Sequence, residues 1–144
     1  PTITMIHIRA SSGNYVFTMQ LEQENSPQTC QWFLDRLPYK THMSQGRWSG
    51  KAVFSRLGTT AAKIAYEAAT SFPKPGDIVM YPGDEQRGGG EIYMPYGPNM
   101  FACEYGRIAG NHFLSIIEGA EQLAAFGELT HWHGAQEILF ERIG

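Results

Sequence analysis

The chain of 144 residues has a formal net charge of −3 at pH 7, with 42% hydrophobic and 17% charged residues. These are the proportions of a globular protein, and the length suits one domain over residues 1–144 that buries roughly two-thirds of its unfolded surface. The small negative charge without a basic cluster argues against nucleic acid and anionic membranes as partners, and no segment has the ~20 consecutive apolar residues that a membrane-spanning helix needs.

The first residues and the cysteines predict the compartment. The segment Pro1-Thr2-Ile3-Thr4-Met5 lacks the basic and apolar regions of a secretory signal. Cys30 and Cys103 lie in unlike contexts and form no CxxC motif, so we expect two thiols in a reducing compartment. Both features predict a cytoplasmic protein.

The N-terminal half opens with a predicted β-hairpin. Its strands cover 2–8 and 15–21, and Ser11-Ser12-Gly13-Asn14 forms the turn. A helix then begins at Asn25-Ser26-Pro27, where a capping side chain precedes proline in the first turn, and ends at Pro38. Further along, strands are predicted at 39–45 and 52–54 and a helix at 59–72.

The C-terminal half is richer in strands. Extended segments are predicted at 78–81, 91–95, 100–104, 112–117 and 135–143. A glycine-rich loop covers 83–90, and a short helix runs from Glu121 to Phe126 and stops near Gly127. About eight or nine short strands, without regular alternation with helices, favour a barrel or sandwich over a doubly wound sheet. We therefore expect a mainly β fold, a small closed barrel with two or three capping helices.

Three polar residues near glycine turns are the first candidates for chemistry. Glu91 follows three glycines, and Asn111-His112 comes just before an apolar run. If their strands are adjacent, a general base, a fixed hydrogen-bond donor for an oxyanion and a titratable acid would converge at one end of the barrel. The alternative is that Asn111 and His112 satisfy backbone groups of a nearby loop.

A second candidate is Arg47-Trp48-Ser49-Gly50. An arginine can bind a substrate carboxylate with two hydrogen bonds, and a tryptophan offers a flat apolar wall. The alternative places Arg47 on the outside of the barrel and Trp48 in the core. The segment is not a phosphate-binding loop, because one spacer residue is missing and Lys51 is not followed by Ser or Thr.

His131-Trp132-His133 is a third candidate. On a strand, the two imidazoles would point the same way, and with Glu137 they would resemble the first metal motif of cupins. The glycine spacing before His131 differs from that motif, and only seven residues follow Glu137. We expect a tryptophan wall flanked by exposed histidines and no metal or cofactor, with metal binding by the two histidines left open.

Several short motifs with glycine, proline or tryptophan occur in order along nearly the whole chain. They are Arg47-Trp48-Ser49-Gly50, Pro75-Gly76-Asp77, Tyr81-Pro82-Gly83, Gly90-Glu91-Ile92, Pro95-Tyr96-Gly97, residues 106–113 and Trp132-x-Gly134-Ala135-Gln136. In this order they resemble an uncharacterised bacterial family with a cyclophilin-like barrel, similar to the cyclophilin-like domain of cucumopine and mikimopine synthases, which join histidine to a keto acid. The resemblance implies a closed eight-stranded barrel with two capping helices. The Arg-Phe-Gln-Trp-His constellation of peptidyl-prolyl isomerases is not found in order.

The sequence therefore favours an enzyme that performs cofactor-independent acid–base chemistry on a small, polar, nitrogen-containing or carboxylated metabolite. The reaction would be hydrolysis, ring opening or closure, or isomerisation, with Glu91 or His112 moving the proton. Substrate contacts are expected from Arg47, Trp48, Ser49, Tyr96, Asn111, Trp132 and Gln136. The main alternative is a non-catalytic protein that binds a small ligand; a peptidyl-prolyl isomerase and a metal-dependent, cupin-like enzyme are weaker ones. Homo-oligomerisation is left open.

Overall fold

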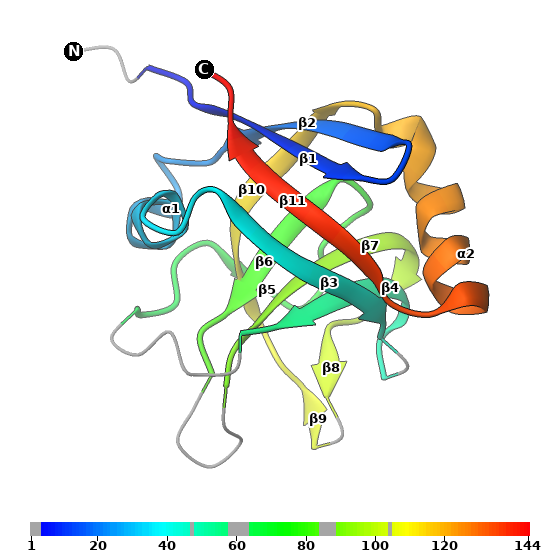
Figure 1. Ribbon diagram of the computed structural model, residues 1–144. Coiled ribbons are helices and arrows are strands. Elements are labelled where there is room, and N and C mark those ends of the chain that lie inside the picture. The colour runs from blue at the N-terminus through cyan, green and yellow to red at the C-terminus, as the bar shows by residue number, and fades with distance from the viewer. Residues whose placement is uncertain (1–3, 47, 58–63, 84–88, 104) are drawn as a thin grey trace.

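The computed structural model describes the chain except for residues 1–3, 47, 58–63, 84–88 and 104. Within the described residues, nine strands form one antiparallel sheet in the order β2-β1-β11-β3-β4-β7-β6-β10-β5. The sheet closes because β2 also pairs with β10, so eight strands form a barrel and β5 lies beside it (Figure 1). The strands of this sheet are β1 (His7–Ser12), β2 (Tyr15–Leu21), β3 (Tyr39–Gln45), β4 (Gly50–Arg56), β5 (Ala69–Thr70), β6 (Asp77–Tyr81), β7 (Glu91–Asn99), β10 (Gly110–Glu118) and β11 (Gln136–Arg142). The predicted closed barrel is confirmed.

Two helices lie on opposite sides of the barrel (Figure 1). They are α1 (Pro27–Leu34) and α2 (Leu123–His133), and a short 3-10 helix, η1 (Ala120–Gln122), leads into α2. Each helix inserts one phenylalanine into the main core. Phe33 of α1 lies edge-to-face against Phe113, with ring centroids 5.1 Å apart, and Phe126 of α2 contacts Phe17 at 5.8 Å. Such aromatic pairs add to the stability that burial provides, and they hold the helices against the strands.

A second, smaller apolar cluster lies outside the barrel, on the other face of β4, β6 and β7. Its side chains are Ala52, Val79, Tyr81, Tyr93, Phe101 and Ile108. Alternate residues of a strand point to opposite faces, so β7 sends Ile92 and Met94 to the main core and Tyr93 to this cluster. The covering segment carries the two-stranded ribbon β8 (Ala102–Cys103) and β9 (Gly106–Arg107). Its Phe101 stacks on Tyr93 with the ring centroids 4.1 Å apart.

The ladder between β3 and β4 is short. Only Ser44 with Phe54 and Gln45 with Val53 are in register, whereas β4 and β7 share six pairs. On their other edges, β3 pairs with β11 over residues 39–43, and β4 pairs with β7 from Gly50 to Arg56. The two strands therefore diverge, and the hydroxyls of Thr41 and Ser55 are hydrogen-bonded across the divergence.

The predicted helix at 59–72 is wrong for the described residues 64–72, and 58–63 lie outside the described part. This stretch is irregular, with Ala68 at a positive φ of 47°, and contains β5, which pairs with the start of β10. Its apolar spacing suits a helix, but a distant side chain forms hydrogen bonds with its backbone. Asn111 accepts a hydrogen bond from the Glu67 amide and donates one to the Ala65 carbonyl. Long-range hydrogen bonds of this kind override local propensity.

Helix α2 is longer than predicted. It passes Gly127 and includes His131-Trp132-His133, which would have to lie on a strand for the two imidazoles to point the same way. Residues two apart on a helix do not share a face, so the two imidazoles do not point the same way. Gly127 does not stop the helix because it is a contact point: a Cβ there would lie 2.3 Å from Cγ of Tyr96. Within the described residues, no helix is long and apolar enough to span a membrane.

The substitution Gly127→Ala should test this contact. In an exposed helix the change normally stabilises by roughly 0.5–1 kcal/mol, but here we expect the free energy of unfolding to fall by about 1–3 kcal/mol, because the methyl group would push α2 away from Tyr96. Urea denaturation followed by circular dichroism measures the difference. A variant more stable than the parent would contradict this packing.

Candidate functional site

An open pocket lies on the outer face of the barrel, between the outer faces of β4 and β7 and the segment that carries β8 and β9. It encloses about 590 Å³, the solvent at its mouth included. Aromatic side chains form much of its wall: Trp48, Phe54, Tyr81, Tyr93 and Tyr105. Among the described residues, Ser49, Arg56, Glu91 and Cys103 add polar side chains to the lining.

Glu91 enters this wall because of the glycine before it. At Gly90 a Cβ would lie 2.2 Å from the carbonyl oxygen of Tyr81, so only glycine allows the chain to approach β6 this closely. Glu91 is consequently the first residue of β7, in register with Tyr81 on one side and with Arg56 on the other. The half-buried carboxylate and the exposed guanidinium thus belong to neighbouring strands of one pocket wall.

Ser49 holds the far wall of the pocket. Its buried hydroxyl donates to the carbonyl of Ala102 and accepts from the amide of the same residue, both at 3.0 Å. A hydroxyl is both donor and acceptor, so one side chain satisfies both backbone groups at the start of β8. Beside it, Tyr93 donates to Oδ1 of Asn99 at 2.9 Å, and burial raises the pKa of Tyr93 well above its usual range. The phenol is therefore neutral at physiological pH.

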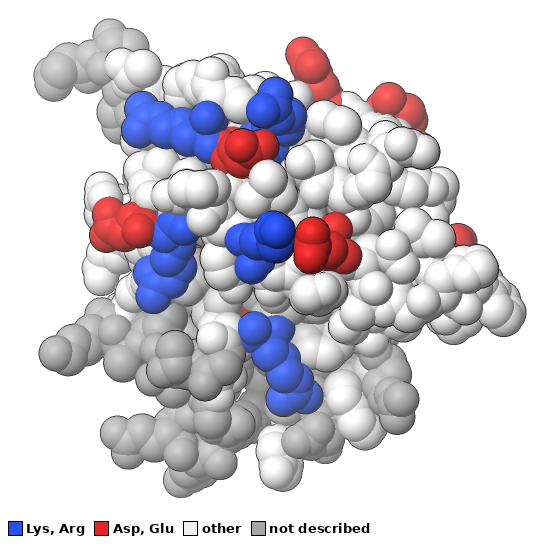
Figure 2. Space-filling view, in the orientation of Figure 1, with Lys and Arg blue, Asp and Glu red and all other residues white. Residues whose placement is uncertain are grey.

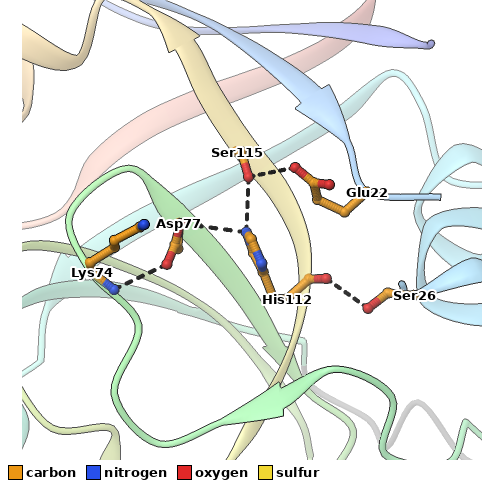
Figure 3. Close-up of polar contacts among 6 residues, drawn as sticks. All are labelled: Glu22, Ser26, Lys74, Asp77, His112 and Ser115. Atoms are coloured by element: carbon orange, nitrogen blue, oxygen red, sulfur yellow. Dashed lines mark hydrogen bonds and ion pairs between the residues drawn. The ribbon is translucent and has the colours of Figure 1, made fainter. Parts of the chain in front are cut away.

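His112 takes part in a different polar network (Figure 3). Its Nε2 lies 2.9 Å from Oγ of Ser115 and 3.5 Å from Oδ1 of Asp77, and Ser115 donates to Oε1 of Glu22 at 2.7 Å. Because the single hydroxyl hydrogen of Ser115 goes to Glu22, its oxygen accepts from Nε2, which identifies Nε2 as the protonated nitrogen of His112.

His112 is also tied to the start of α1, and it lies across β6 from the pocket. The carbonyl of His112 accepts a hydrogen bond from the Ser26 hydroxyl at 2.6 Å, so the residue that precedes α1 is tied to β10. Val79 of β6 is in register with His112 on one side and with Tyr93 on the other. The strand β6 thus stands between His112 and the pocket wall, and His112 is not among the lining residues.

Asn111 points into the protein. Its side chain is fully buried, and its amide nitrogen donates to Oγ1 of Thr29 at 3.1 Å and to the carbonyl of Ala65 at 3.0 Å. Its Oδ1 accepts from the amide of Glu67 at 3.1 Å. Asn111 therefore joins β10, α1 and the segment before β5. The expected convergence of Glu91, Asn111 and His112 at one end of the barrel is wrong, because the strand alternation turns Asn111 away from the face that carries Glu91.

Three other candidates lie apart from this pocket. Tyr96 packs against α2 and donates to Oε1 of Gln45 at 2.7 Å. Trp132 is 73% exposed on α2, and Gln136 donates to the carbonyl of Gly134. The structure brings together Trp48, Ser49 and Glu91. Trp48 is 53% exposed at the pocket and not in the core, and Arg47 lies outside the described residues.

The remaining lining residues were missed by the sequence analysis. Arg56 and Phe54 are two apart on β4, and Tyr93 is two apart from Glu91 on β7, so strand periodicity places each pair on the outer face. That periodicity was available from the sequence. Nothing in it indicated that the segment around Cys103 and Tyr105 folds over this face.

The other cysteine, Cys30, is buried in α1 and donates to the carbonyl of Phe113. Burial raises the pKa of Cys30 from 9.0 to about 12, and the charges of Glu67 and Glu22 act in the same direction. The folded chain thus holds the thiol proton more tightly than the unfolded chain. This contribution to stability is complete below pH 9 and is lost as the pH rises toward 12.

We therefore expect the free energy of unfolding to fall between pH 9 and pH 12 more steeply in the parent than in Cys30→Ala. The excess slope should approach ~1.4 kcal/mol per pH unit, the value for one proton. Denaturant titrations of both proteins over this range measure it. Parallel pH profiles would show that Cys30 has no such role.

The sequence matches the model of a family described as a protein of unknown function, DUF3830, over residues 8–141. The chain belongs to the DUF3830 family. No curated protein matches it. Solved structures similar to this DUF3830 protein include McbB in complex with tryptophan, with 15% identity and a TM-score of 0.72, covering 95% of this chain and 45% of McbB. This DUF3830 protein thus spans less than half the length of McbB.

Two further solved structures match almost from end to end. The hypothetical protein AF2241 from Archaeoglobus fulgidus has 15% identity and a TM-score of 0.62, covering 96% of this chain and 95% of that one. A cyclophilin-type peptidyl-prolyl cis-trans isomerase from Cryptosporidium parvum has 13% identity and a TM-score of 0.62, covering 98% and 99%. At these identities the matches establish the fold alone. The resemblance of this DUF3830 protein to cyclophilin-like barrels, predicted from its motifs, is thereby confirmed.

Proposed function

We propose that the outer pocket binds and converts a small, polar, nitrogen-containing or carboxylated metabolite, and that Glu91 moves the proton. The observation that carries the proposal is the placement of Glu91: a half-buried carboxylate stands in register with a guanidinium on the wall of a pocket otherwise rich in aromatic side chains. General acid–base catalysis needs a titratable group within reach of the substrate, and a pocket wall provides that position.

The other side chains have roles that follow from their chemistry. Arg56 would neutralise a substrate carboxylate, or the negative charge that develops when Glu91 removes a proton beside a carbonyl group. Trp48 and Tyr105 offer flat apolar surfaces for a planar substrate. Ser49, already bonded to Ala102, would keep the wall in place rather than touch the substrate. Proton removal and return are common to isomerisation, ring opening or closure, and hydrolysis.

The size and chemistry of the pocket favour a substrate similar to an amino acid with a ring. The McbB structure, with the same fold, is a complex with tryptophan, which combines a carboxylate, an amine and an aromatic ring. In this chain, Arg56 and Glu91 could meet a carboxylate and a nitrogen, and the aromatic wall could meet the ring. The substrate class is thus a zwitterionic or cyclic nitrogen compound in the size range of an amino acid.

The proposal is tested by incubating the protein with amino acids, cyclic amides and keto acids and analysing the products by mass spectrometry. A thermal-shift screen first selects ligands, because any ligand of the native state raises the melting temperature. A new product from a stabilising compound supports an enzyme. A compound that stabilises the protein and is recovered unchanged at all enzyme concentrations identifies a binding protein instead.

The position of Cys103 provides an independent check that a ligand occupies this pocket. Cys103 lines the pocket and is half-buried, whereas Cys30 is 1% exposed. We expect a ligand at ten times its dissociation constant to slow alkylation of Cys103 about ten-fold, since only the unoccupied protein reacts. Peptide mapping after a timed iodoacetamide pulse measures both cysteines, with Cys30 as the internal control. Unchanged labelling of Cys103 would place the ligand elsewhere.

A further inference from the structure

The divergence of β3 and β4 opens a second hollow beside the pocket. It is lined by Thr41, His42, Ser44, Phe54, Ser55 and Arg56 and encloses about 570 Å³, open solvent included. The hollow exists because the ladder between the two strands ends at Ser44 and Phe54. Two of its residues, Phe54 and Arg56, also line the pocket of Glu91, so the two spaces share part of β4 as a common wall.

The lining of this hollow is rich in hydrogen-bond donors. Among the described residues, its lining contains three hydroxyls, one imidazole and one guanidinium and has no carboxylate. Thr41 and Ser55 share one hydrogen bond, and Ser55 is 2% exposed, so Thr41 is the hydroxyl of this pair that a ligand can reach. Donors without a carboxylate, together with a guanidinium, suit the oxygens of an anion.

The carboxylates near this hollow are engaged elsewhere. Glu137, in register with His42, forms an ion pair with Lys40 at 3.8 Å, and Glu91, in register with Arg56, belongs to the wall of the first pocket. Basic and acidic side chains accordingly alternate over the face formed by β1, β11 and β3 (Figure 2). In the described part of the chain, the Arg56 guanidinium lies over the ring of Phe54, 5.7 Å from its centroid, and forms no ion pair with a carboxylate.

We infer that the hollow between β3 and β4 is an anion subsite that holds a carboxylate or phosphate group of the substrate through Arg56 and the hydroxyls of Thr41 and Ser44. As part of the substrate site this inference rests on the proposed function, but anion binding itself does not require Glu91. It narrows the substrate class to molecules with an anionic group on one side of Phe54 and the reacting part on the other. The shared wall of Phe54 and Arg56 sets the distance between the two.

The subsite is tested by NMR titration of the amide resonances with inorganic phosphate and, separately, with acetate, at constant ionic strength. We expect saturable shifts at residues 41–44 and 54–56, with phosphate bound more tightly if the natural group is a phosphate and acetate if it is a carboxylate. Arg56→Gln should weaken binding at least about ten-fold and Thr41→Val several-fold, since each removes a donor. The exposed Arg142 gives a matched control, and Arg142→Gln should stay within two-fold.

Two outcomes would overturn the subsite: shifts scattered over the basic surface without saturation, or equal affinities of Arg56→Gln and the parent. Amide spectra of each variant confirm that it is folded. Glu91→Gln separates this inference from the proposed function, because it should keep anion binding even where turnover is lost. If Glu91→Gln keeps full turnover while the subsite binds phosphate, the proposed proton transfer fails and the subsite stands.

Discussion

Replacing Glu91 by Gln should lower turnover by roughly 10²–10⁴-fold, the contribution of a positioned general acid or base. Glutamine has nearly the same shape as glutamate but cannot take up a proton at neutral pH. Glu91 is the first residue of β7 and faces an open pocket, so the free energy of unfolding should change by less than about 0.5 kcal/mol. Steady-state kinetics on the substrate found by product analysis, together with urea denaturation, measure both quantities.

Two further variants serve as controls for the effect of Glu91→Gln on turnover. Glu137→Gln removes an exposed carboxylate on β11 and should leave turnover unchanged. His112→Gln breaks the contacts with Ser115 and Asp77, which lie outside the pocket, and should act on stability more than on turnover. Full activity of Glu91→Gln would end the proton-transfer role, and loss of activity in a fully stable His112→Gln would return that role to His112.

Asn111→Ala should lower the free energy of unfolding by on the order of 3 kcal/mol. The substitution removes three hydrogen bonds made by a fully buried side chain: those to the Glu67 amide, the Ala65 carbonyl and the Thr29 hydroxyl. Thr29 still donates to Oε1 of Glu67. Lost hydrogen bonds and the groups left unsatisfied cost about 1–3 kcal/mol each, and the costs partly overlap because the segment can relax. Chemical denaturation followed by fluorescence measures the loss.

The control for this effect is Asn14→Ala, which changes an exposed asparagine in the β1–β2 turn and should cost far less. Turnover per folded molecule distinguishes the two readings of Asn111. If Asn111 only holds α1 and the segment before β5 in place, activity should scale with the folded fraction. A stable variant with lost activity would instead support the substrate-orienting role predicted from the sequence.

The strands were predictable because short apolar or alternating segments stand between turns rich in glycine and proline. The segments 15–21, 39–45, 78–81 and 91–95 all lie in strands of the barrel. Such patterns are local properties that a single sequence displays, and the number of such segments points to a barrel. The segment 64–72 was not predictable in this way, because its path depends on hydrogen bonds from Asn111, more than forty positions away.

The candidate site was predictable only in part, for the same reason. Glu91 follows a run of glycines, and Trp48-Ser49 stands between two glycines, so the sequence indicated both as candidate site residues. Their joint position in one pocket depends on the register of β4 with β7. In the sequence, Arg56 cannot be distinguished from other charged residues on the solvent side of a strand, because its register with Glu91 is a property of the folded sheet. Glycine also proved ambiguous: Gly127 looks like a helix stop and is a close contact with Tyr96.

The presence of two separate apolar clusters has a consequence for how this scaffold can diversify. Tyr81, Tyr93 and Ile108 line the pocket and belong to the outer cluster, whereas Ile92 and Met94 belong to the core that holds the barrel together. Exchanges among the outer side chains would reshape the cavity at a cost confined to one face. Substitutions on this face can therefore change ligand specificity while the packing of the main core, and the stability that it provides, is kept. This makes the outer face the natural target for directed evolution.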